Sequence, residues 1–383
     1  MFPTALITNI PIPLLIAALL IFSGYTWVIR RCNRILMRLP LFRASGTSSE
    51  SVAVVIAARN EEANIGDCLE SLLKQTLPAD QREIIVVDDG SDDKTASIVA
   101  SYANQGVVLI RMTEADGAGK KAALRKGIAS TKKEIIVTTD ADCIFESDWL
   151  NTLLLFRQKE NAVFVAAPVR YRRERSWLDR FQSLDFLSLQ AVTVAAVSAR
   201  LFNMCNGANL LYTRAAYDAV NGFEGNDHIA SGDDMFMMEK VARSFPGQVR
   251  FCYSREAIVT TTAPDSWRAF FRQRIRWASK SPHYSHAGIK VVLLVVYLVN
   301  VGLTAMMLSL FFLPQYFPLW VFLVLMKGFV EYPLMIRIAR FFKKEHLLPW
   351  FLPIQPLHSL YTVMAGGFGL IGTYEWKGRR EKS

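Results

Sequence analysis

Asp140 and Asp142, two aspartates separated by one residue, are the side chains with the clearest chemical potential in the chain. In an extended segment, residues two apart point to the same side, so their carboxylates would lie together. Carboxylate oxygens suit Mg2+ and Mn2+, which proteins bind through one or two carboxylates together with substrate phosphates. A helix cap or an ordinary turn is the alternative explanation for such a pair taken alone.

Lys120 follows a glycine-rich turn, Gly117-Ala118-Gly119, and stands at the expected start of a helix. A helix N-terminus beside an ammonium group suits phosphate oxygens. The spacing differs from that of a P-loop. Together with the acidic pair, Lys120 predicts a site for a nucleoside diphosphate held by a divalent cation, Mn2+ or Mg2+.

Asp233 and Asp234 precede an amphipathic helix expected at Met235–Val241. A carboxylate in this place can act as a general base, or it can serve only to cap the helix. Both interpretations stay open on these residues alone.

Gln273, Arg276 and Trp277 lie in an aromatic and basic helix expected at Ser266–Lys280. Alternating aromatic and basic positions at helical spacing predict a helix that lies on a membrane surface. A role in a substrate site is the alternative for these three side chains.

Alternating strands and helices must position these residues. Strands are expected at Val52–Ile56, Glu83–Val87, Val107–Arg111, Glu134–Thr138 and Val163–Val169, and helices at Asn64–Gln75, Lys94–Ala103, Lys120–Ala129 and Asp148–Gln158. This alternation predicts an α/β fold with a mainly parallel sheet and helices on both faces. Polar residues follow the first four strands, and ligands bind outside the carboxyl ends of such strands. We therefore expect one polar rim.

Apolar runs of membrane-spanning length flank this region. Pro11–Ile29, Val291–Leu313 and Phe317–Ile336 are close to the roughly 20 residues that cross a bilayer as a helix. Arginines follow the first run, which predicts an outside N-terminus and a cytoplasmic α/β domain. A further run, Leu352–Thr373, is either a span or a re-entrant or interfacial segment, and the sequence leaves this open.

The composition agrees with a chain that contains both a soluble domain and membrane segments. Of 383 residues, 51% are hydrophobic and 20% charged, and 44 basic against 34 acidic residues give a net charge of +10. Because the basic residues cluster beside the apolar runs, we expect a membrane partner and no nucleic acid. The 5 cysteines include no C-x-x-C pair, which argues against a zinc site or a disulfide framework.

These patterns divide the chain into five expected segments. They are a transmembrane helix at 1–30, a basic linker at 31–50, a catalytic domain at 51–264, an interfacial helix at 265–288, and a C-terminal membrane region of two or three helices with a basic tail at 289–383.

In its motifs the chain resembles the membrane-bound, inverting branch of the family-2 glycosyltransferases, which have the GT-A fold. The resemblance covers Ser51 to Trp277 and rests on the order and spacing of short motifs. These are Val54–Glu62, Val87-Asp88-Asp89-Gly90-Ser91, Gly119–Leu124, Asp140-Ala141-Asp142, Asn206-Gly207-Ala208-Asn209, Gly232-Asp233-Asp234 and the Q-x-x-R-W of Gln273, Arg276 and Trp277.

The resemblance implies a role for each matching residue. The nucleotide-sugar pocket would comprise Ala58, Arg59, Glu61, Asp88, Asp89, Lys120 and Asp140, closed by Gln273, Arg276 and Trp277. Asp142, with Asp140, would bind the metal, and Asp234 would be the catalytic base with Asp233 as its acidic neighbour. Asn206, Gly207 and Asn209 would belong to the acceptor or donor pocket. Asp233 stands where the family usually has Glu, which has a longer side chain.

The resemblance implies transfer of a sugar, with inversion, from a UDP-sugar or similar donor to a hydroxyl of a lipid or lipid-linked acceptor. The expected location is the bacterial inner membrane, with the catalytic domain in the cytoplasm. A processive polysaccharide synthase that extends a glycan is the alternative. A non-catalytic scaffold and a Rossmann-type oxidoreductase are rivals from other classes, and no G-x-G-x-x-G follows the first strand to support the latter. Donor sugar, acceptor and oligomeric state stay open.

Overall fold

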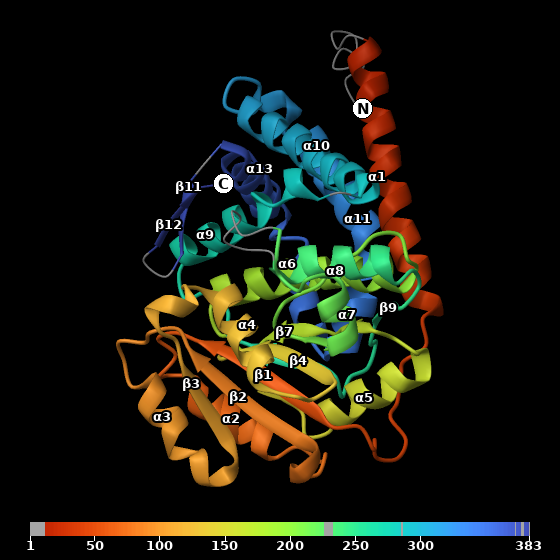
Figure 1. The fold of residues 1–383 in the computed structure, drawn as a ribbon. Coiled ribbons are helices and arrows are strands. Elements are labelled where there is room, and N and C mark those ends of the chain that lie inside the picture. Colours follow the sequence, from red (N-terminus) through yellow and green to blue (C-terminus); the bar gives the residue numbers. More distant parts are fainter. Residues whose placement is uncertain (1–11, 226–232, 285, 372, 377–378, 383) are drawn as a thin grey trace. The chain divides into compact units, whose positions relative to one another are not determined.

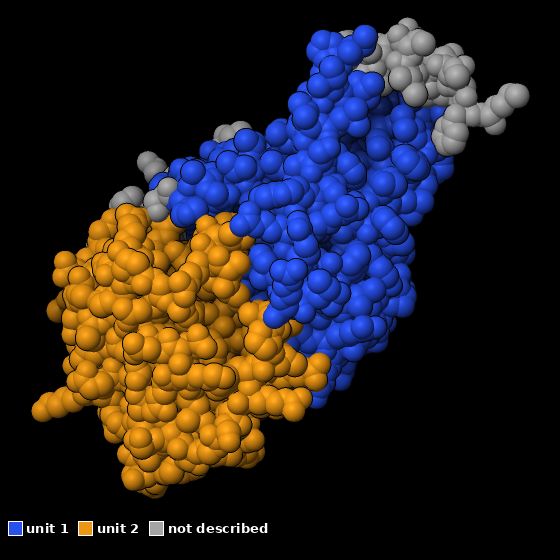
Figure 2. Space-filling view, turned by 90° about the vertical axis from the view of Figure 1, so that its right-hand side faces the viewer, with its two compact units in different colours: residues 1–38, 175–195, 264–383 blue, residues 39–174, 196–263 orange. Residues whose placement is uncertain are grey.

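The computed structural model describes residues 12–225, 233–284, 286–371, 373–376 and 379–382. These residues form two compact units, which Figure 2 colours separately. Unit 2 comprises residues 39–174 and 196–263, and unit 1 comprises the described parts of residues 1–38, 175–195 and 264–383. Each unit is described by itself.

Unit 2 is built on a mainly parallel sheet (Figure 1). Within the described residues it has seven strands in the order β3-β2-β1-β4-β8-β6-β9. Their bounds are β1 Val52–Ala58, β2 Arg82–Asp88, β3 Val107–Arg111, β4 Ile135–Asp140, β6 Phe164–Ala166, β8 Leu210–Thr213 and β9 Val249–Phe251. Strands β1 to β4 are parallel to one another, and β8 runs antiparallel between β4 and β6. The expected α/β class is confirmed.

Helices connect and cover the parallel strands. Their bounds are α2 Ile65–Leu73, α3 Thr95–Ser101, α4 Lys120–Ser130 and α5 Trp149–Glu160. Right-handed crossovers put α2 and α3 on one face, because β1, β2 and β3 follow in one direction, and put α4 on the other, because β4 lies back beyond β1. Gly127 lets α4 approach the sheet closely, since a Cβ there would lie 2.5 Å from Val55 Cγ1 and 2.9 Å from Val87 Cγ2.

The fifth expected strand, Val163–Val169, is wrong as a single strand. It divides into β6 and β7 (Val169–Tyr171), and β7 belongs to a second sheet with β5 (Ile144–Phe145) and β10 (Val259–Thr261). Pro168 stands at the division, and proline has no N–H to continue a ladder. Its carbonyl instead accepts hydrogen bonds from Val259 N at 3.0 Å and Asn209 Nδ2 at 2.8 Å.

Unit 1 is helical. Its main helices are α1 Ile12–Arg38, α6 Trp177–Ser198 (up to residue 195), α9 Trp267–Ala278, α10 Ala287–Ser309, α11 Phe317–Phe342, α12 Leu348–Phe351 and α13 Gln355–Ile371. Helix α1 packs against α10 and α11, and α13 packs against α9 and α10 (Figure 1). The chain then forms a hairpin of β11 Thr373–Trp376 and β12 Arg379–Lys382.

Among the described residues, three helical segments are long and apolar enough to cross a membrane. They are Ile12–Arg38, Ala287–Ser309 and Pro314–Phe342. Each overlaps one of the three expected spans. Helix α13 has 17 residues and packs closely through glycines, because a Cβ on Gly369 would lie 2.7 Å from Ala278 Cβ. Whether Leu352–Thr373 crosses the membrane stays open.

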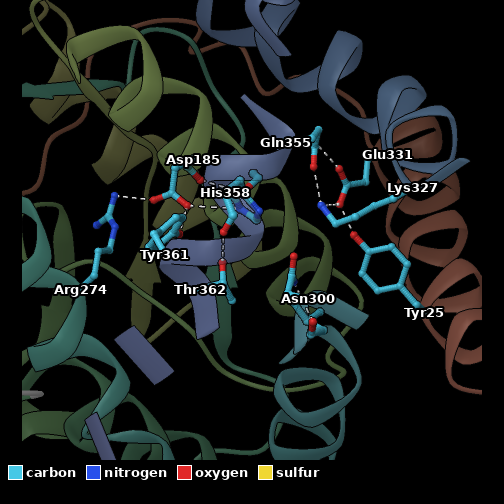
Figure 3. Close-up of polar contacts among 12 residues, drawn as sticks. Tyr25, Asp185, Arg274, Asn300, Lys327, Glu331, Gln355, His358, Tyr361 and Thr362 are labelled. Atoms are coloured by element: carbon cyan, nitrogen blue, oxygen red, sulfur yellow. Dashed lines mark hydrogen bonds and ion pairs between the residues drawn. The ribbon is translucent and has the colours of Figure 1, made fainter. Parts of the chain in front are cut away.

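A buried ion pair lies inside the apolar helix α11 (Figure 3). Lys327 is 0% exposed, and its Nζ lies 2.9 Å from Glu331 Oε1 and 2.5 Å from Gln355 Oε1. Gln355 Nε2 donates to Glu331 Oε2 at 3.0 Å, and the Tyr25 hydroxyl also donates to Glu331. This network links α1, α11 and α13, and it satisfies charges that are costly in an apolar environment.

Lys327→Met should destabilise unit 1 strongly, because it leaves the mostly buried Glu331 carboxylate without its cation. Breaking a buried pair in this way costs about 3–5 kcal/mol. The double variant Lys327→Met/Glu331→Gln removes both charges and should recover most of that loss. Unfolding of the purified protein in detergent measures both. A single variant as stable as the wild type would contradict the assignment.

Candidate active site

The carboxyl ends of the first four strands lie at one edge of the sheet. In the strand register, Ala57 on β1 pairs with Asp140 on β4, and Ala58 pairs with Asp88 on β2. Asp88 in turn pairs with Arg111 at the end of β3. The structure therefore brings the expected strand-end residues into one rim.

Asp89 connects three segments of this rim. Both of its carboxylate oxygens accept from the backbone N of Gly119, at 3.0 and 3.1 Å. Arg59 Nη1 lies 3.7 Å from Asp89 Oδ2 and donates to the Asp89 carbonyl oxygen at 3.3 Å. The backbone N of Asp89 donates to Ala58 O at 2.9 Å. Asp89 thus ties the turn before α4 to the ends of β1 and β2.

Asp88 and Glu61 hold the loops beside Asp89. Asp88 is buried, and its Oδ1 accepts from the backbone and hydroxyl of Ser91. Glu61 accepts from Asn64 Nδ2 at 3.0 Å, and its backbone N donates to Thr95 Oγ1 at 2.8 Å. These contacts fix the shape of the rim, and a nucleoside-binding role for both residues remains a prediction.

The acidic pair follows β4 as expected. Asp140 forms an ion pair with Lys120 at the start of α4. Asp142 Oδ2 accepts from Thr261 Oγ1 at 2.8 Å and from Thr262 N at 3.4 Å. Burial and the nearby Asp140 charge raise the pKa of Asp142 to about 6. A cation would relieve this repulsion.

The donor set of this pair fits a hard divalent cation. Two carboxylates offer oxygen ligands of the kind that Mg2+ and Mn2+ prefer. In the part of the chain that the structure describes, no group of three or more His, Cys, Asp or Glu residues could hold a metal ion by itself. A cation bound by Asp140 and Asp142 would therefore need further oxygens, such as those of a diphosphate.

The side chains of Asp234 and Lys120 both lie close to Gly207. A Cβ built on Gly207 would lie 3.3 Å from Asp234 Oδ2 and 3.4 Å from Lys120 Nζ. Asp234 stands in the first turn of α8 (Asp233–Ser244), and its Oδ1 accepts from Met235 N at 2.9 Å. The structure thus brings Asp234, Lys120 and Asp140 into one cluster, although they are far apart in sequence.

Gly207→Ala should lower the sugar transfer that the motif resemblance implies, without unfolding the protein. The added methyl must push the Asp234 carboxylate or the Lys120 ammonium by a few tenths of an ångström, and small displacements at a reacting site are costly. We expect kcat/KM to fall on the order of 10-fold.

Gly302→Ala is the matched control, because a Cβ there meets nothing within 4 Å. Donor-dependent kinetics and thermal unfolding should be measured for both variants. Wild-type kinetics for Gly207→Ala would argue against a tight arrangement at this point.

Asn206 and Asn209 shape the segment that holds Gly207. Asn209 is 0% exposed, and its Nδ2 donates to Pro168 O and Ala257 O, both at 2.8 Å. Its Oδ1 accepts from Trp149 Nε1 at 3.0 Å. Asn206 Oδ1 accepts from Ala208 N at 3.0 Å. Asn209 therefore anchors this segment to Pro168, Ala257 and Trp149. A direct contact of Asn206 or Asn209 with substrate stays a prediction.

Some expected site residues cannot be compared with this cluster. Gly232 lies outside the described residues, and of Asp233 only the backbone, which opens α8, is described. Gln273, Arg276 and Trp277 lie on α9, which belongs to unit 1. Their proposed closure over a diphosphate remains a prediction.

Thr261 is a site residue that the sequence analysis missed. Its hydroxyl donates to Asp142, and it comes from β10, in the second sheet. The sequence offers no signal for this contact, because the two residues are 119 positions apart and neither belongs to a common local motif.

Comparison with known proteins finds a family domain within the chain. The model of the family "Glycosyl transferase family 2" matches residues 53–220. The chain carries a family-2 glycosyltransferase domain. The expected resemblance to the family-2 glycosyltransferases is thereby confirmed.

Relatives of the chain include two curated bacterial proteins. The poly-beta-1,6-N-acetyl-D-glucosamine synthase of Staphylococcus epidermidis is 26% identical over 243 residues, which cover 63% of this chain and 57% of the relative. The "Probable glycosyltransferase YdaM" of Bacillus subtilis is 28% identical over 248 residues, with the same coverage of 63% and 57%. The match thus spans little more than half the length of these relatives.

A solved structure supports the fold of the family-2 domain. The mannosyltransferase PcManGT from Pyrobaculum calidifontis, solved with GDP-Man and Mn2+, matches with a TM-score of 0.59 and 19% identity. The match covers 92% of this chain and 98% of that one. With the mainly parallel sheet and the family match, it confirms the expected GT-A fold.

Proposed function

We propose that this protein is an inverting glycosyltransferase that moves a sugar from a nucleoside-diphosphate sugar to an acceptor hydroxyl. The observation that carries this proposal is the meeting of Asp234 and Lys120 at Gly207, with Lys120 paired to Asp140. A carboxylate that can take the proton of the acceptor hydroxyl and a cation for the leaving diphosphate are the two groups that a single displacement needs. The family-2 domain supports the reaction class.

In the proposed reaction, the Asp234 carboxylate accepts the proton of the acceptor hydroxyl. The acceptor oxygen then forms a bond to the anomeric carbon from the side opposite the diphosphate. The bond from that carbon to the diphosphate oxygen breaks, and its electron pair leaves with the nucleoside diphosphate. One displacement inverts the anomeric configuration, and Lys120 would stabilise the negative charge that builds on the leaving group.

Asp142, with Asp140, would hold a divalent cation in this site. The raised pKa of Asp142 and the hard oxygen donors support that assignment. A bound Mn2+ or Mg2+ supplies positive charge that neutralises the departing diphosphate. The Mn2+ of the similar mannosyltransferase structure makes Mn2+ the first ion to test.

The rim residues Arg59, Glu61, Asp88 and Asp89 would form the nucleoside side of the pocket, beside Ala58 at the end of β1. We propose a UDP-sugar as donor, as the motif resemblance implies. GDP-sugars are the necessary comparison, because the similar mannosyltransferase was solved with GDP-Man. A thermal-shift series with UDP, GDP and NAD tests whether the site binds a nucleoside diphosphate or an oxidoreductase cofactor. A bound ligand raises the unfolding temperature of the protein.

We propose a membrane-embedded lipid or lipid-linked hydroxyl as acceptor. The three candidate spans support a membrane location, and the arginines after the first span support a cytoplasmic family-2 domain. An inner-membrane location in a bacterium agrees with the bacterial relatives. Gln273, Arg276 and Trp277 would close over the diphosphate beside the acceptor entrance.

A processive polysaccharide synthase is the second candidate function. The relative named poly-beta-1,6-N-acetyl-D-glucosamine synthase favours it, at 26% identity. Sizing the product after incubation with radiolabelled UDP-sugars distinguishes the two. A lipid carrying one or a few sugars supports our proposal, and a polymer would replace it with the second candidate.

A further inference from the structure

Asp185, on α6, is a buried acidic residue outside the proposed reaction centre. It is 2% exposed. Figure 3 shows three side chains that point toward its carboxylate. Arg274 Nη2 lies 2.6 Å from Asp185 Oδ2, His358 Nε2 lies 3.6 Å from Oδ1, and the Tyr361 hydroxyl donates to Oδ1. One carboxylate therefore joins α6, α9 and α13.

Arg274 lies inside the Q-x-x-R-W segment of α9. It directly follows Gln273, and it is 4% exposed. Its guanidinium carbon lies 4.2 Å from the centroid of the Trp277 ring and 4.9 Å from that of Phe270. Arg274, which pairs with Asp185, thus also packs against the Trp277 ring. Such stacking gives a cation–π contribution in addition to the ion pair.

An aromatic cluster reinforces the same junction. The Phe270 ring centroid lies 5.6 Å from Phe181 on α6 and 5.2 Å from Tyr361 on α13. Both contacts are edge-to-face, the geometry that aromatic pairs favour. Phe270 and Arg274 therefore fix the buried face of α9 to α6 and α13. The other three side chains of the motif are less buried than Arg274; they are Gln273, Arg276 and Trp277.

We propose that the Asp185–Arg274 ion pair is a positioning device that sets the rotation of α9 and thereby fixes the orientation of Gln273, Arg276 and Trp277, the three residues proposed to bind the nucleotide sugar. This inference rests on the proposed function of those three residues. Asp185 and Arg274 are positioning residues and touch no substrate. A buried ion pair suits such a role. A small rotation of the helix would separate the two charges, and an uncompensated buried charge costs much free energy.

The ionised state of Asp185 agrees with this role. Burial raises the pKa of its carboxyl, but the Arg274 charge and the His358 and Tyr361 contacts outweigh burial and hold that pKa below its ordinary value. The carboxylate is therefore charged at neutral pH and available to Arg274.

The test compares four forms of the full-length protein with the wild type in detergent. They are Asp185→Asn, Asp185→Asn/Arg274→Gln, Asp185→Glu, and the control Glu50→Gln/Arg157→Gln. The single Asp185→Asn leaves Arg274 buried without its counter-charge, whereas the double variant removes both charges and should fold. The control removes another arginine–carboxylate pair, in unit 2, whose Nε–Oε2 distance is 3.1 Å.

Hydrogen–deuterium exchange of residues 267–278 is the first measurement, because it reports the stability of α9 without any substrate. We expect exchange there to accelerate at least about 10-fold in the double variant, since the helix loses its buried fixation. Exchange in α10 should be unchanged. In the control pair, exchange of 267–278 should match the wild type.

Donor kinetics are the second measurement. We expect kcat/KM for the nucleotide sugar to fall about 100-fold in the double variant, mostly through KM, because misplaced binding groups weaken donor contacts. Asp185→Glu should recover part of the loss. A double variant that folds with wild-type exchange at 267–278 and wild-type kinetics would overturn the positioning role. If the wild type itself transfers no sugar, the proposed function fails, and the exchange measurement alone decides the positioning role.

Discussion

Asp234→Asn should abolish sugar transfer while the protein keeps its affinity for the nucleoside diphosphate. The amide cannot accept a proton from the acceptor hydroxyl, but it has nearly the same size and can still accept the hydrogen bond from Met235 N. Loss of a general base costs about 100- to 10,000-fold in turnover. Initial rates with a nucleotide sugar, together with calorimetric titration of UDP and GDP, measure both properties.

Glu239→Gln is the matched control for this prediction. Glu239 lies on the same helix, α8, and pairs with Arg243 at 3.5 Å, away from the Gly207 contact. It should retain transfer within a few-fold of the wild type. Turnover near wild type in Asp234→Asn would remove Asp234 from the role of base. Loss of nucleotide binding together with turnover would mean that the substitution disturbs the pocket instead of the proton transfer.

Removing the divalent cation should stop the reaction as well. We expect excess EDTA to lower transfer at least about 100-fold, because the charge on the departing diphosphate would then lack its strongest stabilising group. Added Mn2+ should restore the rate. Asp142→Asn should produce a similar loss that extra Mn2+ reverses only in part, since one of the two carboxylates is missing. Initial rates across an EDTA and Mn2+ titration measure these effects.

Asp67→Asn serves as the control for Asp142→Asn. Asp67 is an exposed carboxylate on α2 whose partner, Arg172, lies 3.0 Å away. Its loss should leave the response to EDTA and Mn2+ as in the wild type. Full activity in excess EDTA would refute the metal role of Asp140 and Asp142, even if transfer itself is confirmed.

The rim could be predicted from sequence because each part of it is local. Apolar β-rich runs end in polar residues, and parallel strands carry those ends to one edge. The pairing of Ala57 with Asp140 and of Ala58 with Asp88 follows from that rule. The start of α4 at Lys120 also matches, because the preceding Gly119, at φ 95°, takes a backbone conformation that glycine adopts readily.

Contacts between distant segments could not be predicted in this way. Thr261 reaches Asp142 from another sheet, and Gly207 brings Lys120 to Asp234, yet no local pattern encodes either pairing. Helix α6 was also missed. Its residues are largely buried around the whole circumference, so its sequence lacks the one-sided apolar stripe of a surface helix.

The junction at Asp185 illustrates the same limit. An aspartate that is fully buried in a soluble helix is nearly always paired, but the sequence does not say which cation pairs with Asp185. The helix that contains Arg274 was expected to lie on a membrane surface. In the structure, Arg274 is instead buried, with its guanidinium paired to Asp185 and stacked on the Trp277 ring. One buried ion pair thereby changes Arg274 from a surface charge into the group that fixes α9.

The anomeric configuration of the product is the most direct measurement of the central claim. The purified full-length protein is incubated with lipid extract, Mn2+ and a panel of UDP- and GDP-sugars, and products are identified by mass spectrometry and NMR. We predict that one donor yields a glycoside whose anomeric configuration is opposite to that of the donor, and that Asp234→Asn yields none. A product that retains the configuration of the donor, or no transfer from any nucleotide sugar, would contradict an inverting glycosyltransferase.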